Sequence, residues 1–205
     1  MTNKSLLVSL IGMDGAGKTT TSKKLLKELK KKKFKVKYIY VGRGRNNILP
    51  IQFFGKKIKI ESSIEKDKDL KKRKLKKNNI SLIHTLGAPI FSLDLLLRYY
   101  FQIKPLKKKY DIIITDRYTT DILLMNKVPK FLKKSLYYLF PKPELSFYLY
   151  NDINILHKRK KHPIADLKRQ KKIFNEINKL IKPIEIKTDD LNITINEILK
   201  HIQKN

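Results

Sequence analysis

Short apolar runs alternate with longer amphipathic stretches along the chain, and this alternation predicts its architecture. Residues 6–11 are almost wholly apolar and lead into a glycine-rich turn, as expected for a buried parallel strand. Residues 18 to about 33 follow with leucines on one helical face. Residues 36–41 predict a second strand, so the N-terminal part of the chain is expected to form a βαβ unit.

The alternation continues to the end of the chain. Further strands are predicted at 112–115, 145–150 and 184–186. Helices are predicted at 81–103, where Pro105 would stop the helix, and at 119–125, 129–140 and 153–161. A lid at 162–168 is followed by a helix that runs to 181. A last helix is predicted at the C-terminus, where Thr194 and Glu197 have capping-box spacing. These elements predict a single three-layer α/β domain over residues 1–205, with a mostly parallel, five-stranded sheet and a small helical lid at about 158–170.

The pattern weakens between residues 42 and 80, where we expect a variable basic insertion. It begins with a loop that carries Arg43 and Arg45. Residues 66–77 are strongly charged and have little apolar face. A solvated helix, a mobile insertion and partial disorder all fit that composition.

Composition narrows the possible chemistry. The chain has no cysteine, which excludes disulfides, cysteine-based zinc sites and thiol catalysis. It contains 48 Lys and Arg against 18 Asp and Glu, for a net charge of +30. A field of that sign attracts polyanions, but an AT-rich genome would also enrich lysine.

Because no apolar run reaches the roughly 20 residues of a membrane span, a cytoplasmic protein is expected.

The turn after the first strand matches the Walker A pattern of glycine, four residues, then Gly-Lys-Thr. Glycines let the backbone wrap around phosphate oxygens, and the positive end of the following helix faces the same anion. Lys18 is expected to reach the β- and γ-phosphates, and Thr19 to offer its hydroxyl to Mg²⁺. The predicted nucleotide-binding residues are Gly12, Met13, Asp14, Gly15, Ala16, Gly17, Lys18, Thr19 and Thr20.

A second apolar strand, residues 112–115, ends at Asp116. This is the form of a Walker B strand, whose carboxylate helps to hold magnesium or its waters. Many ordinary strands also end in aspartate, so the assignment depends on the Walker A motif. Together the two motifs predict ATP and Mg²⁺ as cofactors, with Thr19 and Asp116 at the metal.

Several segments, in chain order, resemble the thymidylate kinase family. The Asp-Gly-Ala-Gly-Lys core of the P-loop and the triplet Asp116-Arg117-Tyr118 are its most specific features. Residues 103–106, residues 143–149 and Arg159 add support. The resemblance spans about residues 5–200 and implies a P-loop kinase fold.

The resemblance also implies roles for individual side chains. Asp14 would approach the acceptor sugar or order a basic residue, Arg117 would hold the acceptor phosphate, and Tyr118 would line the acceptor pocket. Arg159, with a further lid cation (Lys160, Lys161 or Arg169), would pack on the donor nucleotide or steady the transferring charge. Each has a structural alternative: a loop cap for Asp14, an ion pair for Arg117 and core packing for Tyr118.

The acceptor side departs from the family pattern. The family's Arg-Glu-Pro segment is replaced by Gly-Arg-Gly-Arg, which leaves Arg43 and Arg45 as substitutes for its phosphate contact. Leu95 stands where the family has an arginine, and Arg98 lies one turn later. No glutamine follows Tyr118 to read a thymine base, and losing such a hydrogen bond can change selectivity greatly.

The resemblance therefore implies a nucleoside monophosphate kinase that phosphorylates dTMP or a related monophosphate. Two alternatives remain: a P-loop kinase for another acceptor, such as a deoxynucleoside or a non-nucleotide phosphate, and a basic nucleic-acid-binding ATPase. The expected partners are nucleotide substrates, with no membrane. The apolar segment 82–101 offers a face for a homodimer.

Overall fold

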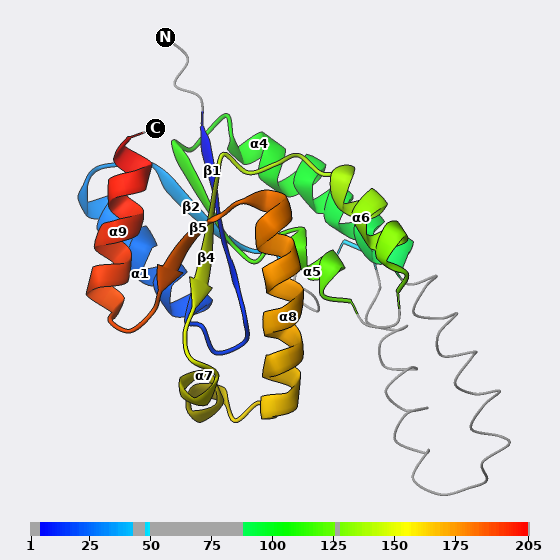
Figure 1. Ribbon diagram of the computed structural model, residues 1–205. Helices are drawn as coiled ribbons and strands as arrows, with labels where there is room; N and C mark the ends of the chain where they lie inside the picture. The colour runs from blue at the N-terminus through cyan, green and yellow to red at the C-terminus, as the bar shows by residue number, and fades with distance from the viewer. Residues whose placement is uncertain (1–4, 43–47, 50–87, 126–127, 205) are drawn as a thin grey trace, which may run out of the picture.

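The computed structural model describes residues 5–42, 48–49, 88–125 and 128–204. Its centre is a five-stranded, fully parallel sheet in the order β2-β3-β1-β4-β5 (Figure 1). The strands are β1 (Leu6–Gly12), β2 (Val36–Tyr40), β3 (Ile112–Asp116), β4 (Leu145–Tyr150) and β5 (Ile184–Lys187). The predicted P-loop-type α/β fold is thus confirmed, and the carboxyl ends of all five strands meet at one edge.

Helices cover both faces of the sheet. They comprise α1 (Lys18–Lys31), a helical stretch at 88–98 that continues as the π-helix η2 (Tyr99–Ile103) and α4 (Lys104–Leu106), then α5 (Thr120–Leu123), α6 (Lys130–Tyr138), α7 (Ile153–Lys160), α8 (Ile164–Ile181) and α9 (Leu191–Gln203). Helices α1 and α9 pack on one face, and α8 lies on the other (Figure 1). None of the helices described is long and apolar enough to cross a membrane.

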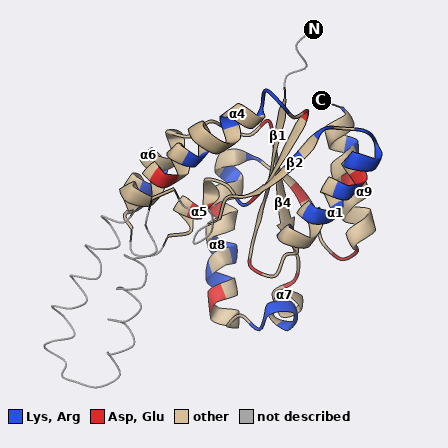
Figure 2. Ribbon diagram, turned by 180° about the vertical axis from the view of Figure 1, so that it is seen from behind, with Lys and Arg blue, Asp and Glu red and all other residues tan. Residues whose placement is uncertain are grey.

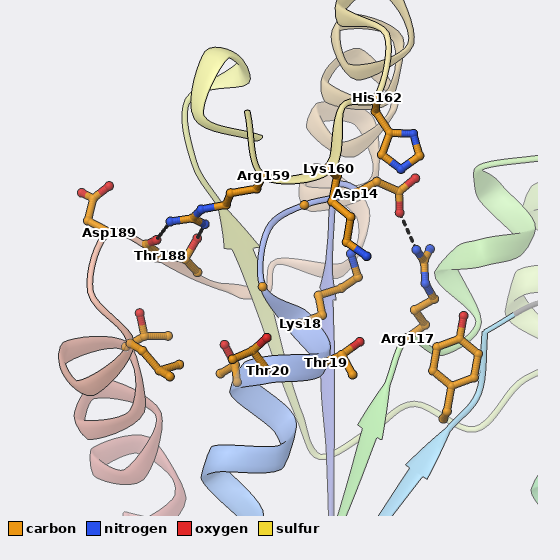
Figure 3. A pocket seen from close by; sticks show the side chains of 16 residues that line it. Asp14, Lys18, Thr19, Thr20, Arg117, Arg159, Lys160, His162, Thr188 and Asp189 are labelled. Atoms are coloured by element: carbon orange, nitrogen blue, oxygen red, sulfur yellow. Dashed lines mark hydrogen bonds and ion pairs between the residues drawn. The ribbon is translucent and has the colours of Figure 1, made fainter. Parts of the chain in front are cut away.

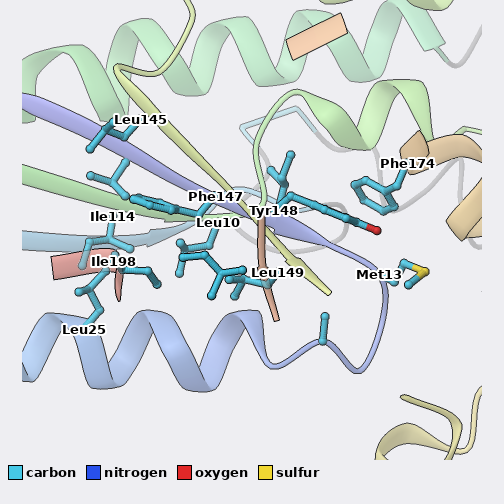
Figure 4. Packing of buried hydrophobic residues seen from close by; sticks show 14 of the residues in the cluster. Leu10, Met13, Leu25, Ile114, Leu145, Phe147, Tyr148, Leu149, Phe174 and Ile198 are labelled. Atoms are coloured by element: carbon cyan, nitrogen blue, oxygen red, sulfur yellow. The ribbon is translucent and has the colours of Figure 1, made fainter. Parts of the chain in front are cut away.

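Alternation along the strands divides the core between the two faces. On β4, Phe147 packs against α9, where its ring lies 6.0 Å from that of His201. The next residue, Tyr148, points the other way and packs 5.1 Å from the ring of Phe174 on α8 (Figure 4). Phe147 is fully buried, and burial of one such side chain stabilises the fold by about 1.5–3 kcal/mol. The two helical layers therefore pack against both faces of the central strands. This packing fixes the position of the loop after β1.

Three sequence predictions need correction. The C-terminal helix is capped by Asp190, whose carboxylate accepts from the backbone N–H groups of residues 192 and 193, so Thr194 lies inside the helix. Most of the predicted lid is the start of α8, which begins at Ile164. Pro105 does not stop its helix, because the preceding π-turn places it in the first turn of α4, where a missing N–H is tolerated. Residues 66–77 lie outside the described part.

Candidate active site

The loop between β1 and α1 requires its glycines for steric reasons. Gly12 has a φ of 148°, and a Cβ there would lie 2.2 Å from the carbonyl oxygen of Leu149. Gly15 has a φ of 87°, and its Cβ would lie 2.9 Å from the carbonyl oxygen of Leu156. No real Cβ makes contacts that short, so the backbone can follow this path only with glycine. The result is a tight loop at the N-terminus of α1, the arrangement that binds phosphate.

Lys18 is the first residue of α1 and is only 6% exposed. Its Nζ donates to the carbonyl oxygens of Gly12 at 2.9 Å and of Met13 at 2.7 Å. Burial lowers the pKa of Lys18 to about 8, and the nearby positive charge of Arg117 adds to that effect. The amine is therefore held inside the loop, where an incoming phosphate oxygen would compete with two carbonyls for it.

Thr19 and Asp116 meet at the carboxyl end of β3, as the two Walker motifs predict. The Thr19 hydroxyl donates to Asp116 Oδ2 at 2.5 Å, and the Tyr38 hydroxyl reaches the same oxygen at 3.3 Å. Asp116 is fully buried, and within the described residues its Oδ1 has no hydrogen-bond partner. A buried carboxylate oxygen with a free lone pair beside a hydroxyl fits a hard, oxygen-seeking cation, so this donor set suits Mg²⁺.

Arg117 follows β3 in a left-handed conformation, with a φ of 66°. Such a conformation is costly for a non-glycine residue and is concentrated at functional sites. Its guanidinium pairs with Asp14 at 2.5 Å and with Asp121 at 3.3 Å. Burial would lower the pKa of Arg117, but the Asp121 and Asp14 carboxylates outweigh it and raise that pKa. The arginine is thus permanently charged and held beside the P-loop.

Asp14 responds to the same contacts. Burial would raise the pKa of its carboxyl, but the charges of Arg117 and Lys18 outweigh burial and hold that pKa below its ordinary value. Asp14 therefore stays ionised at neutral pH. Figure 3 shows it facing Arg117 across the top of the P-loop.

A cavity of about 740 Å³ opens over these groups (Figure 3). That volume lies within the usual range of small-molecule sites. One side is the P-loop and the start of α1, and the other comes from the end of α7 and the loop after β5. Its lining residues are Asp14, Gly15, Gly17, Lys18, Thr19, Thr20, Thr21, Tyr40, Arg117, Arg159, Lys160, His162, Thr188, Asp189, Leu191 and Thr194.

The predicted lid cations separate in space. Arg159 and Lys160 both line the cavity. The Arg159 guanidinium donates to the carbonyl oxygen of Thr188 at 2.9 Å, which ties α7 to the loop after β5. Arg169 instead pairs with Asp166 on α8 at 2.6 Å. Lys161 ends α7 in a left-handed conformation and is not among the lining residues described.

Tyr118 and Arg98 lie away from the cavity lining. Tyr118 is buried in the core, and its hydroxyl donates to the carbonyl oxygen of Pro141 at 3.0 Å. Burial raises the pKa of this hydroxyl, so it stays protonated. Arg98 is buried in an ion pair with Asp94 and donates to the carbonyl oxygen of Gly42 at 3.3 Å. The contacts of Tyr118 fit its alternative role in core packing, and those of Arg98, a candidate for an acceptor-phosphate contact, are an ion pair and backbone hydrogen bonds; Arg43 and Arg45 lie outside the described residues.

Sequence reasoning missed several residues of this region, three of which contact or lie beside the predicted ones. Tyr40 lines the cavity near the end of β2, and Asp121 pairs with Arg117. Gln170 on α8 binds both the backbone and the side chain of Asp14. Only the four-residue spacing of Arg117 and Asp121 was visible in the sequence. Gln170 stands 156 residues from its partner, and no local pattern marks it.

Comparisons with known proteins give a fold but no family assignment. No protein-family model matches the chain, and no curated protein matches it. Solved structures do match it. One is the crystal structure of thymidylate kinase from Ehrlichia chaffeensis, with a TM-score of 0.61 and 20% sequence identity, covering 98% of this chain and 99% of that one. The chain therefore has the fold of a P-loop kinase over nearly its whole length.

Proposed function

We propose that this protein is a nucleoside monophosphate kinase that transfers the γ-phosphate of ATP to dTMP or a related monophosphate. The observation that carries the proposal is the contact between Asp14 and Arg117. It fixes a permanently charged arginine beside a loop built to bind nucleotide phosphates. A phosphate-binding loop alone would fit any P-loop protein that binds a nucleoside triphosphate. A second anion-binding group at its rim fits an enzyme that places a second phosphate there.

In this proposal the P-loop and Lys18 hold the donor. Backbone N–H groups of the P-loop other than that of Asp14, which is bonded to Gln170, bind the phosphates, and Lys18 leaves its two carbonyl partners to reach the β- and γ-phosphates. Thr19 and Asp116 hold the magnesium ion. When bound, that ion offsets charge on the transferring phosphoryl group.

Arg117 binds the acceptor phosphate in line with the donor. Its planar fork suits a phosphate, and its pairing with Asp14 and Asp121 orients it before substrate arrives. Tyr40, at the rim of the same cavity, contacts the acceptor. No covalent intermediate is needed, because positioning and charge stabilisation account for phosphoryl transfer of this kind.

We assign the two lid cations different tasks. Arg159 is held against Thr188 and packs on the donor nucleotide away from the phosphates. Lys160 has no hydrogen-bond partner among the residues described, and it points into the cavity in Figure 3. Lys160 is therefore our candidate for the lid charge that contacts the transferring group.

An acceptor screen tests the proposal. Purified protein with Mg-ATP is assayed for ADP release in the presence of dTMP, dUMP, the other nucleoside monophosphates, and thymidine as the unphosphorylated control. We expect turnover with at least one monophosphate, dTMP included, and none with thymidine. Activity with thymidine alone would refute the proposal and indicate a deoxynucleoside kinase.

One observation favours the kinase for another acceptor. Tyr118, which the resemblance places in the acceptor pocket, is buried in the core. The cavity therefore lacks one contact that the resemblance would give the acceptor, in addition to the glutamine that would read thymine. We accordingly expect dTMP turnover to be less selective than that of a typical thymidylate kinase.

We also propose that a second copy of the chain covers an exposed apolar surface on the helical segment 88–103. Four of its large apolar side chains are more than a third exposed: Ile90, Leu93, Tyr100 and Phe101. Several large apolar side chains exposed on one helical segment fit an interface better than solvent. Light scattering of the Leu93→Glu variant tests this: a dimer that becomes monomeric supports the proposal, and a wild-type monomer refutes it.

A further inference from the structure

Gln170 lies on α8 and joins that helix to the P-loop through a single residue, Asp14. Its Oε1 accepts from the backbone N–H of Asp14 at 3.0 Å, and its Nε2 donates to Asp14 Oδ2, also at 3.0 Å. The second hydrogen of Nε2 points to Asp166 Oδ2 at 3.0 Å. Gln170 is only 5% exposed and is not among the residues that line the cavity. It therefore acts on the site only through its neighbours.

These three contacts fix both the residue type and the orientation of the amide. A flipped amide would bring its oxygen against two carboxylates and its nitrogen against a backbone N–H. A glutamate would keep the bond to the Asp14 N–H but would add a third carboxylate to Asp14 and Asp166. A shorter or apolar side chain would leave buried polar groups without partners. Only glutamine satisfies all three partners at once.

The contact continues from Asp14 to the proposed acceptor arginine. Asp14 Oδ2 is held by Gln170, which leaves Oδ1 facing Arg117 Nη2 at 2.5 Å. One turn along α8, Phe174 shares a core cluster with Met13, and the two side chains lie near each other in Figure 4. Helix α8 therefore holds Asp14 by hydrogen bonds, and its Phe174 belongs to the same core cluster as the neighbouring residue Met13.

We propose that Gln170 is a positioning residue that couples helix α8 to the orientation of Arg117, with Asp14 as the link. When α8 is seated, Gln170 holds the Asp14 carboxylate turned toward Arg117, and the arginine presents its fork to the acceptor phosphate. When α8 shifts, Asp14 is released and Arg117 loses one of its two carboxylate partners. The acceptor role of Arg117 rests on the function proposed above, whereas the coupling of α8 to Asp14 does not.

Three variants test the coupling. Gln170→Met keeps the length and removes the hydrogen bonds, and Gln170→Glu keeps the shape but replaces the two donor hydrogens of Nε2 with negative charge. Lys171→Ala, an exposed neighbour on the same helix, is the matched control. We expect the KM for dTMP to rise about tenfold in both Gln170 variants, the size expected for losing hydrogen bonds to a charged group, with the affinity for Mg-ADP nearly unchanged. The Lys171→Ala variant should match the wild type.

The pH profile separates positioning from a general loss of structure. In Gln170→Glu the new carboxyl faces Asp14 and Asp166, with Arg117 and Arg169 on the far sides of those two and Lys18 beside Asp14. Two carboxylates already surround it, so one of the three pKa values rises. The defect should therefore be smaller at about pH 6, where one carboxyl is protonated, than at about pH 8. The Gln170→Met variant should show no such dependence.

A complementary swap tests the direct contact. In the Asp14→Asn/Gln170→Glu double variant the amide and the carboxylate exchange places, so a hydrogen bond between positions 14 and 170 can form again. We expect its KM for dTMP to be at least about threefold lower than the product of the two single defects predicts. Multiplicative defects, together with a pH-independent Gln170→Glu variant, would overturn the proposal.

Hydrogen exchange at the P-loop separates failure of the coupling from failure of the proposed function. The Asp14 amide is bonded to Gln170 in the wild type, so a peptide containing residue 14 should exchange faster in Gln170→Met and unchanged in Lys171→Ala. Faster exchange without turnover of any monophosphate by the wild type would retain the coupling and refute the monophosphate kinase. Unchanged exchange in Gln170→Met would overturn the coupling whatever the acceptor proves to be.

Discussion

The two halves of the candidate site are built in different ways. The phosphate-binding part of the proposed donor half comes from one continuous segment, residues 12–20, with Asp116 added from β3 and Arg159 from α7. The proposed acceptor half is assembled from three separate parts of the chain: Tyr40 at the end of β2, Arg117 and Asp121 after β3, and Asp14, which it shares with the P-loop. The first depends on local backbone geometry, and the second on packing between distant elements. The acceptor half is therefore free to diverge while the fold and the donor loop are kept.

The behaviour of similar residues in the two halves illustrates this difference. Lys18 and Arg98 are both buried cations. Lys18 is held by two loop carbonyls and can exchange them for phosphate. Arg98 is paired with Asp94, whose other oxygen accepts from the backbone N–H groups of Ile48 and Leu49 at 2.8 Å each. Arg98 thus ties the chain after β2 to the helix at 88–98.

The largest effect should come from breaking the donor half. Lys18→Ala should lower kcat on the order of a thousandfold or more, because it removes the charge that offsets phosphoryl transfer. The Lys18 side chain adds little apolar packing, so thermal unfolding should stay cooperative. Steady-state kinetics and a thermal melt check both expectations, and near wild-type turnover would refute the donor assignment.

The next effect separates the halves. Arg117→Ala should raise the KM for the acceptor on the order of a hundredfold, while the affinity for Mg-ADP changes by no more than about threefold. Arg98→Met is the matched control, because it removes a buried arginine from the structural pair. It should destabilise the fold by about 3–5 kcal/mol through the unpaired Asp94. Calorimetric titration of each ligand distinguishes them; loss of Mg-ADP binding in Arg117→Ala would contradict the division.

The pH dependence sharpens the donor side. The pKa of Lys18 is lowered to about 8 in the free protein, so the amine is charged below that pH and loses its charge above it. The kcat/KM for ATP, which reports the free enzyme, should fall as pH rises through about 8. A Lys18→Arg variant stays charged and should lack this limb, whatever its overall activity. The wild-type profile staying flat to about pH 9 would show that Lys18 is not the titrating group.

The same shift has a consequence for stability, with a defined sign. Because the folded pKa of Lys18 is lower than the ordinary value of 10.5, the unfolded chain binds more protons between about pH 8 and about 10.5. The contribution of Lys18 to stability is therefore unfavourable below that window and improves as pH rises through it. Comparing denaturant midpoints of wild type and Lys18→Met across this range isolates the effect from other lysines.

The smallest effect concerns Tyr118. Tyr118→Phe removes one hydrogen bond, to the Pro141 carbonyl, and leaves the ring in the core. It should cost about 1 kcal/mol of stability and change the acceptor KM by less than about threefold. Chemical denaturation with acceptor kinetics provides the check. A large change in acceptor KM would show that Tyr118 contacts the acceptor, and it would contradict the assignment of Tyr118 to the core.

The sequence predicts local features well and the acceptor half poorly, for physical reasons. The strand predicted at 145–150 matches β4 residue for residue, because apolar runs and glycine turns report local geometry. The cap of α9 was misplaced because Asp190 and Thr194 are both good cap residues, and only the backbone path selects between them. The contacts of Tyr118 and Gln170 could not be assigned, since Tyr118 bonds to the carbonyl of a residue 23 positions away and Gln170 bonds to Asp14, 156 positions away. The placement of Arg98 depends on its burial, which no local pattern marks.

The central claim is that the donor loop passes its phosphate to a monophosphate held by Arg117. Incubation with Mg-ATP labelled at the γ-phosphorus and unlabelled dTMP, followed by separation of the nucleotides, tests it directly. The account predicts label in the β-phosphate of dTDP, and far less of it with Arg117→Ala than with wild type. Label confined to inorganic phosphate, or equal transfer by the Arg117→Ala variant, would contradict it.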